Sequence, residues 1–117
     1  MAYEPVYEQF VAQAPGGAMC RVEFRKAGIL TAGDRPEVYF FDVDGREVMV
    51  AISGGALEEL QRGWRYLSRE EKVDITGRLL RTQIEAGAPL TAANLFLDGE
   101  RLRQLIAELD LRDARFP

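Results

Sequence analysis

Three carboxylates near the middle of the sequence are the first side chains whose spacing suggests chemistry. Asp42, Asp44 and Glu47 lie within six residues, and calcium and magnesium prefer oxygen ligands of this kind. A complete calcium loop, however, needs about twelve residues and a bidentate glutamate at its end. We therefore interpret these residues as solvated acids beside a turn and predict no metal site. A small enzyme that uses them with a divalent cation stays an alternative hypothesis.

The sequence holds few other groups that could act in catalysis. It has no histidine, so the commonest general base and transition-metal ligand are missing. Its single cysteine, Cys20, would need a lysine, an arginine or a helix N-terminus nearby to become a nucleophile. Cys20 alternates with Val22 and Phe24, which indicates a buried core thiol instead. We predict no catalytic residue and no cofactor, and we do not expect an enzyme.

Basic side chains gather in the second half of the chain. Residues 62–81 include six lysines and arginines against three acidic residues, in a chain with a net charge of −4. Helical spacing would place five of them on a basic ridge: Arg62, Arg65, Arg69, Arg78 and Arg81. With Trp64 and Tyr66 nearby for stacking, this ridge could bind nucleic acid or another anion. Because the whole chain is acidic, we favour a solvated face on which the arginines pair with glutamates.

The run from residue 37 to 53 predicts a β-hairpin. Asp44-Gly45 separates two β-rich segments and suits a type I′ turn, which needs positive φ at both central positions. The resulting register places Phe41 opposite Val48 on a core face. Away from the turn the other face is apolar as well, since it carries Val38, Phe40 and Met49. These three side chains would form a patch of roughly a few hundred Å², about the most that a soluble monomer leaves exposed.

We therefore expect this second face to be covered. An N-terminal helix could cover it through Phe10 and Val11, and a C-terminal helix through Leu102 and Leu105. Another subunit is the third possibility. The number of amphipathic helices favours a cover from within the chain. A homodimer through this face or through the hairpin edge stays a serious alternative.

Length and composition indicate a single domain, residues 1–117. Hydrophobic residues make up 47% of the chain and charged residues 29%, which are ordinary values for a globular domain. We find neither a secretory leader nor an apolar run of about eighteen residues, and a single cysteine fits a reducing compartment. We therefore expect a cytoplasmic protein.

The periodicity of the apolar residues predicts an α+β fold. Strict alternation over residues 18–26 predicts a strand, which joins the hairpin at residues 37–53 in a small antiparallel sheet. Three to four helices should pack with this sheet, and the C-terminal half of the chain should be helical.

Helical spacing predicts a short helix over residues 5–14, stopped by Pro15-Gly16-Gly17. Three later helices should begin after residues suited to cap them: Ser53, Ser68 and Asp98. Residues 91–97 fit either a helical turn capped by Thr91 or a short strand, and we favour the turn. The connection Gly54-Gly55 could at most present backbone N–H groups to an anion.

Short motifs between residues 37 and 87 follow a recognisable order. A strand of the form V-x-F leads through a turn glycine to "AIS", then to "AL" and to arginine-rich helices. The matching residues are Val38, Phe40, Gly45, Ala51-Ile52-Ser53 and Ala56-Leu57, with "RTQIEAG" at residues 81–87. This order resembles a small bacterial family of uncharacterised α+β domains. The resemblance implies a fold but no activity, so no functional residue is carried over from it.

Our leading hypothesis is a non-enzymatic, bacterial-type domain that acts by association with itself or with a protein partner. The surface would be the face formed by Val38, Phe40 and Met49, and no membrane or cofactor is involved. Binding of nucleic acid or an anionic ligand by the arginine ridge is the alternative.

Overall fold

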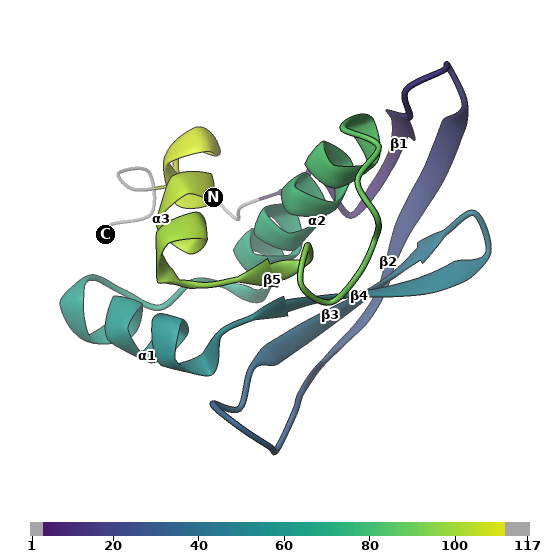
Figure 1. Cartoon of the computed structure of the whole chain (residues 1–117). Coiled ribbons are helices and arrows are strands. Elements are labelled where there is room, and N and C mark those ends of the chain that lie inside the picture. Colours follow the sequence, from purple (N-terminus) through teal and green to yellow (C-terminus); the bar gives the residue numbers. More distant parts are fainter. Residues whose placement is uncertain (1–3, 112–117) are drawn as a thin grey trace.

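The structure, a computed structural model, describes residues 4–111, which form five strands and three helices (Figure 1). In chain order they are β1 (Gln9–Gln13), β2 (Met19–Ile29), β3 (Glu37–Val43), β4 (Arg46–Ile52), α1 (Gly54–Gly63), α2 (Arg69–Glu85), β5 (Phe96–Leu97) and α3 (Gly99–Glu108). The strands form one sheet in chain order. Its pairs are antiparallel except for β4 and β5. The predicted α+β class is confirmed, with the helices in the C-terminal half.

The predicted helix over residues 5–14 is wrong, because half of this segment is the strand β1 and the rest is not helical. Gly16 and Gly17 have φ values of 94° and 98°, a region open to glycine, and they reverse the chain into β2. Phe10 and Ala12 face the interior, whereas Gln9, Val11 and Gln13 are exposed. The buried positions therefore recur every second residue, as in a strand. In so short a segment the same apolar residues also fit helical spacing.

The two predicted strand regions are confirmed, with longer bounds for the first. β2 runs on to Ile29, past a bulge between Phe24 and Lys26 where the register with β3 shifts. The hairpin of β3 and β4 has the predicted register. Its turn residues Asp44 and Gly45 have φ values of 50° and 86°, as a type I′ turn requires.

Residues 91–97 combine the two structures considered for them. Thr91 begins a single turn, in which its carbonyl accepts from the N–H of Leu95 at 3.0 Å. Phe96 and Leu97 then form β5, which pairs in parallel with Ala51 and Ile52. The strands predicted from the sequence pair antiparallel as expected, and β5 adds one parallel neighbour that makes the sheet mixed. Parallel neighbours need a long crossover, here α1 and α2, and no local turn signal reveals such a contact.

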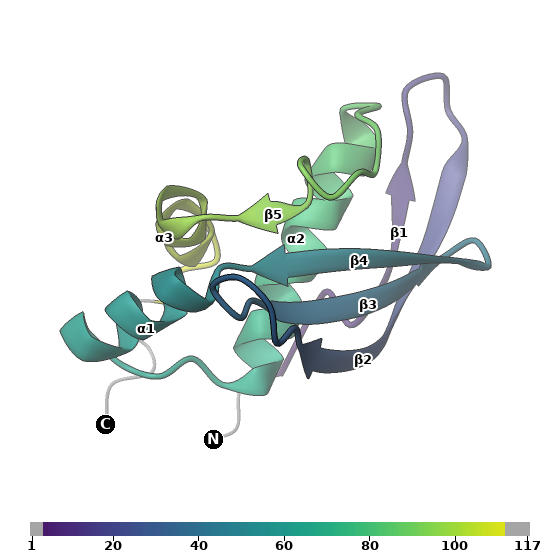
Figure 2. The same cartoon turned by 60° about the horizontal axis from the view of Figure 1, so that its bottom comes forward.

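Helix α2 lies inside the curve of the sheet, with α3 on its other side (Figures 1 and 2). Five consecutive residues, 73–77, are buried, so the middle of this helix is enclosed around its whole circumference. Its burial joins the inner face of the sheet to α1 and α3 in one core cluster. None of the helices within residues 4–111 is long and apolar enough to cross a bilayer.

The three helix starts predicted from capping residues are confirmed. Ser53 accepts from the N–H of Ala56 at the start of α1, and Asp98 accepts from the N–H of Arg101 at the start of α3. Ser68 and Glu71 form the predicted capping box of α2. In each case a side-chain oxygen satisfies an N–H that has no partner within its helix.

The N-terminal segment is held against α2 by two features of that helix. The buried carboxylate of Asp74 accepts from the backbone N–H groups of Val6 and Tyr7, at 2.8 and 2.7 Å. One turn later, Gly77 leaves room for Tyr7. A Cβ atom at Gly77 would lie 2.5 Å from the Cβ atom of Tyr7. The close approach of the two segments therefore requires glycine at this position.

Replacing Gly77 with alanine should lower the free energy of unfolding by about 1–3 kcal/mol, because the added methyl group overlaps Tyr7 and forces a shift. Gly63→Ala is the matched control, since a Cβ atom at Gly63 meets no atom within 4 Å. It should leave stability unchanged or raise it by up to about 1 kcal/mol. Chemical denaturation measures both variants, and equal effects would contradict the proposed close contact.

Candidate functional site

The two faces of the hairpin have different surroundings. On the inner face, five side chains belong to the core cluster and are at most 6% exposed: Tyr39, Phe41, Val43, Val48 and Val50. The helix α2 packs on this side of the sheet (Figure 2). The inner face is therefore the core face predicted from the sequence.

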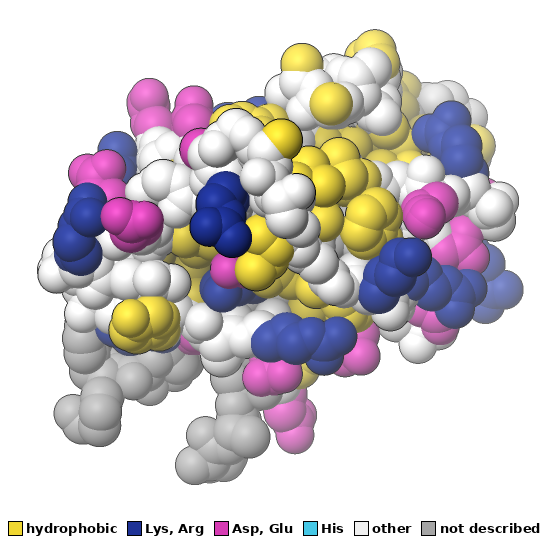
Figure 3. Space-filling model, turned by 90° about the horizontal axis from the view of Figure 1, so that it is seen from below, with side chains coloured by type: hydrophobic (Ala, Val, Ile, Leu, Met, Phe, Trp, Pro, Cys, Tyr) yellow, Lys and Arg dark blue, Asp and Glu magenta, His cyan; other side chains and the backbone are white. Residues whose placement is uncertain are grey.

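The outer face carries Val38, Phe40 and Met49, which we call the outer patch. The register places Phe40 opposite Met49 and Val38 opposite Ala51. None of the outer-patch residues belongs to the core cluster. Val38 is buried between its neighbours at 2% exposure, whereas Phe40 and Met49 are only partly buried. Seen from this side, apolar side chains gather at the middle of the molecule (Figure 3).

Phe96 also belongs to this face, and the sequence reasoning missed it. Strand β5 pairs Phe96 with Ala51, so the two side chains share the outer face. Phe96 is partly buried and lies outside the core cluster. Its position depends on the parallel pairing of β5, which periodicity along the chain does not reveal.

Neither of the two intrachain helices expected to cover the outer patch does so. The N-terminal segment is the strand β1, next to β2 at one edge of the sheet. Leu102 and Leu105 of α3 point into the core cluster, where they are 1% and 7% exposed. The reason is that the enclosed helix α2 already needs both of these elements on the inner side.

Charged side chains border the outer patch. The ammonium group of Lys26 lies 5.2 Å from the centre of the Phe40 ring. Nearer the turn, Asp42 lies opposite Glu47, and the guanidinium of Arg25 binds Asp42 at 2.9 Å and Glu23 at 2.9 Å. An apolar centre with a charged rim is the usual anatomy of a protein interface.

Asp42 and Asp44, two of the three acidic residues near the turn, have structural roles in the fold. Asp44 accepts from the N–H of Arg21 at 2.9 Å and so ties the turn to β2, while Asp42 pairs with Arg25. Within residues 4–111 no three acidic, cysteine or histidine side chains come together as a metal site requires. The hypothesis of a cation-dependent enzyme stays untested.

Cys20 is partly buried on the inner side of β2. Loss of solvent raises the pKa of its thiol, and the negative charge and hydrogen bonding of Asp44 raise this pKa further. A raised pKa lowers the thiolate fraction at neutral pH, which is the opposite of what a nucleophilic cysteine needs.

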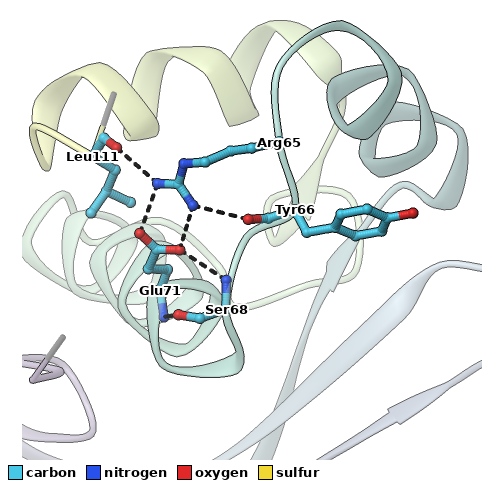
Figure 4. A network of polar contacts seen from close by, with 5 residues as sticks. All are labelled: Arg65, Tyr66, Ser68, Glu71 and Leu111. Carbon is cyan, nitrogen blue, oxygen red and sulfur yellow. Dashed lines mark hydrogen bonds and ion pairs between the residues drawn. The ribbon is translucent and has the colours of Figure 1, made fainter. Parts of the chain in front are cut away.

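The predicted arginine ridge is divided by the end of α1 at Gly63. Arg65 lies in the connection to α2, and its guanidinium binds both carboxylate oxygens of Glu71, at 2.9 and 2.8 Å (Figure 4). The same group donates to the carbonyls of Tyr66 and Leu111, at 2.9 and 2.8 Å. Arg65 therefore joins the start of α2 to the segment after α3, and its donors face the protein.

The remaining arginines of the ridge also have partners within the chain. Arg62 pairs with Glu58 at 2.9 Å, and Arg81 with Glu85 at 2.9 Å. Arg78 and Arg81 both donate to the hydroxyl of Tyr7, at 2.9 and 3.3 Å. The guanidinium of Arg69 lies 5.2 Å from the ring of Phe24. Pairing with glutamates, the interpretation we favoured, describes Arg62 and Arg81 well, and binding of nucleic acid stays an untested alternative.

The N-terminus of α1 is occupied by a carboxylate of the chain itself. Asp34, in the loop between β2 and β3, accepts from the hydroxyl of Ser53 at 2.5 Å and from the N–H of Gly55 at 3.4 Å. The Ser53 hydrogen bond is the main cause of the lowered pKa of Asp34, helped by the N–H groups of Gly54 and Gly55. The anion-binding groups considered at Gly54-Gly55 thus hold the β2–β3 loop in place.

Comparisons with protein-family models, with characterised proteins and with solved structures give no match. The resemblance of residues 37–87 to a bacterial family therefore stays a prediction. Function has to be argued from the chemistry of the described surfaces alone.

Glu71 should make the stability of the protein depend on pH. Burial by itself raises the pKa of Glu71, and hydrogen bonds from Arg65 and Ser68 more than reverse this, so the pKa lies below its usual 4.5. The stabilisation is complete above the pKa of the unfolded chain and is lost as the pH falls through the folded-state pKa.

Glu71→Gln should therefore lower the free energy of unfolding by about 1.5–3 kcal/mol at pH 7 and by much less at acidic pH. Urea denaturation at neutral and acidic pH measures the difference. Glu70→Gln is the control, because Glu70 is exposed on the same turn of α2. A loss at Glu71 that does not change with pH would contradict the assigned role of its charge.

Titration with an oligonucleotide tests the alternative function. Arg62 and Arg69 are suited to substitution by alanine, because neither belongs to the buried network of Arg65. We expect no binding that depends on these residues. Binding at low salt that weakens in Arg62→Ala/Arg69→Ala, and weakens further as salt is added, would instead support a phosphate-binding surface.

Proposed function

We propose that this protein is a non-enzymatic association domain, and that its outer patch binds a second copy or a protein partner. The observation that carries the proposal is the separation of the patch from the core. Phe40 and Met49 are apolar, only partly buried and central on their face of the sheet, and they lie with the buried Val38 outside the cluster that joins the sheet to the helices.

The composition of the patch supports binding to protein. Phenylalanine and methionine are enriched at protein interfaces, and methionine adapts its shape to a partner surface. Phe96 continues the apolar surface beyond Ala51. Rim charges such as Lys26 and Glu47 would give orientation and specificity more than affinity.

The chemistry of the rest of the surface favours this proposal over catalysis. Cys20 has a raised pKa, Asp42 and Asp44 bind Arg25 and the N–H of Arg21, and three of the five ridge arginines bind side chains or backbone groups of distant segments. Cytoplasmic location is part of the proposal and follows from the composition.

Phe40→Glu should abolish self-association through the patch while leaving the protein folded. Tyr66→Glu is the matched control, since it makes the same change at an aromatic residue that is 74% exposed and lies outside the sheet. Light scattering after size exclusion measures the mass, and thermal unfolding confirms the fold. Phe40→Glu should halve the mass, and Tyr66→Glu should leave it unchanged. An unfolded Phe40→Glu protein would show instead that the outer patch is part of the core.

A photo-crosslinking amino acid at position 40 identifies the partner. The same group at Glu58, on the exposed side of α1, is the control. A discrete crosslinked product from position 40 alone would support the patch as the binding surface, with its mass showing a second copy or another protein. Equal labelling from both positions would contradict the proposal.

A further inference from the structure

Strand β1 forms one edge of the sheet. Its five residues, Gln9–Gln13, include no charge and no proline. Soluble proteins usually protect an edge strand with charges, proline, a bulge or a covering segment, because an open edge can pair with another strand. The opposite edge is protected in one of these ways, since β5 is only two residues long.

The hydrogen bonds of the β1–β2 pair show which groups of β1 are free. Phe24 donates to the carbonyl of Glu8 at 2.8 Å, and Ala14 donates to the carbonyl of Ala18 at 2.8 Å. In an antiparallel pair the bonded positions alternate, so the even-numbered residues of β1 bond to β2. The N–H and C=O groups of Gln9, Val11 and Gln13 therefore point away from the sheet, and the described residues provide no hydrogen-bond partner for them.

These free groups are complementary to a second copy of themselves. When two β1 strands pair antiparallel about a two-fold axis at Val11, Gln9 of each copy faces Gln13 of the other. Each pair of facing residues exchanges two hydrogen bonds. The pairing thus satisfies all the outward groups of Gln9, Val11 and Gln13 in both copies.

The side chains favour the same pairing. Val11 is 49% exposed on the outer face. Across the two-fold axis it would lie opposite Val11 of the second copy, and each would cover the other. The flanking pairs of Gln9 with Gln13 are uncharged and can form amide hydrogen bonds. No like charges oppose each other, although the chain as a whole is acidic.

We propose that two copies of the chain associate through β1 and form one continuous sheet across the dimer. The interface is isologous, as in most soluble dimers. It lies at the opposite edge of the sheet from β5, and therefore leaves the outer patch free in both copies. The dimer would present its two outer patches on the same side of the joined sheet, so this inference adds to the proposed function and does not depend on it.

Val11→Pro tests the pairing with little change to the fold. Proline removes the outward N–H at position 11, and the bonds from β1 to β2 use the even-numbered residues. Proline is tolerated on an edge strand for this reason. Val11→Ala is the matched control because it keeps the N–H group. Light scattering should show that Val11→Pro halves the mass of the wild type, and that Val11→Ala keeps the wild-type mass at high concentration.

Val11→Lys gives a second, independent variant. It keeps the backbone intact and places two positive charges opposite each other across the two-fold axis, so it should also halve the mass. Thermal unfolding confirms that each variant is folded. In the wild type, the amide proton of Val11 should exchange more slowly as the protein concentration rises, and in Val11→Lys it should exchange quickly at every concentration.

Variants at positions 11 and 40 separate this inference from the proposed function. The edge contact is judged by the mass of the position 11 variants, and the outer patch by the mass of Phe40→Glu. A folded wild type that stays at 13.1 kDa at high concentration, with an unprotected Val11 amide, would overturn the β1 dimer. An unchanged mass in both Val11→Pro and Val11→Lys would also overturn it.

Discussion

The enclosure of α2 is the constraint on which the rest of this structure depends. A helix whose middle is buried around its whole circumference cannot leave a polar group there without a partner, because an unpaired buried charge costs several kcal/mol. The helix nevertheless contains Glu71, Asp74 and Thr76 at exposures of 1% or less. Thr76 donates to backbone carbonyls of the same helix. The two acids need partners from elsewhere. Those partners determine how the segment before β1 and the segment after α3 pack on the helix.

Each buried acid holds a different part of the chain. Asp74 binds the backbone of Val6 and Tyr7 and so brings the N-terminal segment onto the helix, where Gly77 leaves room for it. Glu71 binds Arg65, which also binds the carbonyl of Leu111 after α3. Segments that are far apart in the sequence therefore meet at one helix. This explains why Arg65, which the sequence places on a basic ridge, turns its donors into the protein.

The same constraint accounts for the free surfaces of the sheet. A curved sheet has one inner side, and α2 occupies it, while α3 packs against α2 and β5. No helix then remains for the outer side of β3 and β4, where Phe40 and Met49 stay only partly buried. The strand β1 is likewise anchored on its inner side by Phe10 and Ala12, and its edge is left without a partner within the described residues. Both proposed contacts arise from this one-sided packing.

Local signals in the sequence were sufficient for much of the fold. The turn at Asp44-Gly45, the register of Phe40 with Met49 and the capping box at Ser68 each depend on residues close together in the chain. Their physics is that of backbone conformation and short-range hydrogen bonding. The outer patch was predictable for the same reason, since the alternation along β3 and β4 places Val38, Phe40 and Met49 on one face of the hairpin.

Only the tertiary structure decided what each of those faces meets. The strand β1 was hidden because five residues can fit both a helical and an extended pattern, and the pairing with β2 selects the second. Phe96 joined the outer face through a parallel pairing with Ala51, across a crossover of two helices. Arg65 binds the carboxylate of Glu71 because Glu71 is buried and needs a partner of opposite charge. Such outcomes depend on burial and on contacts between distant segments, and the identity of single residues does not determine them.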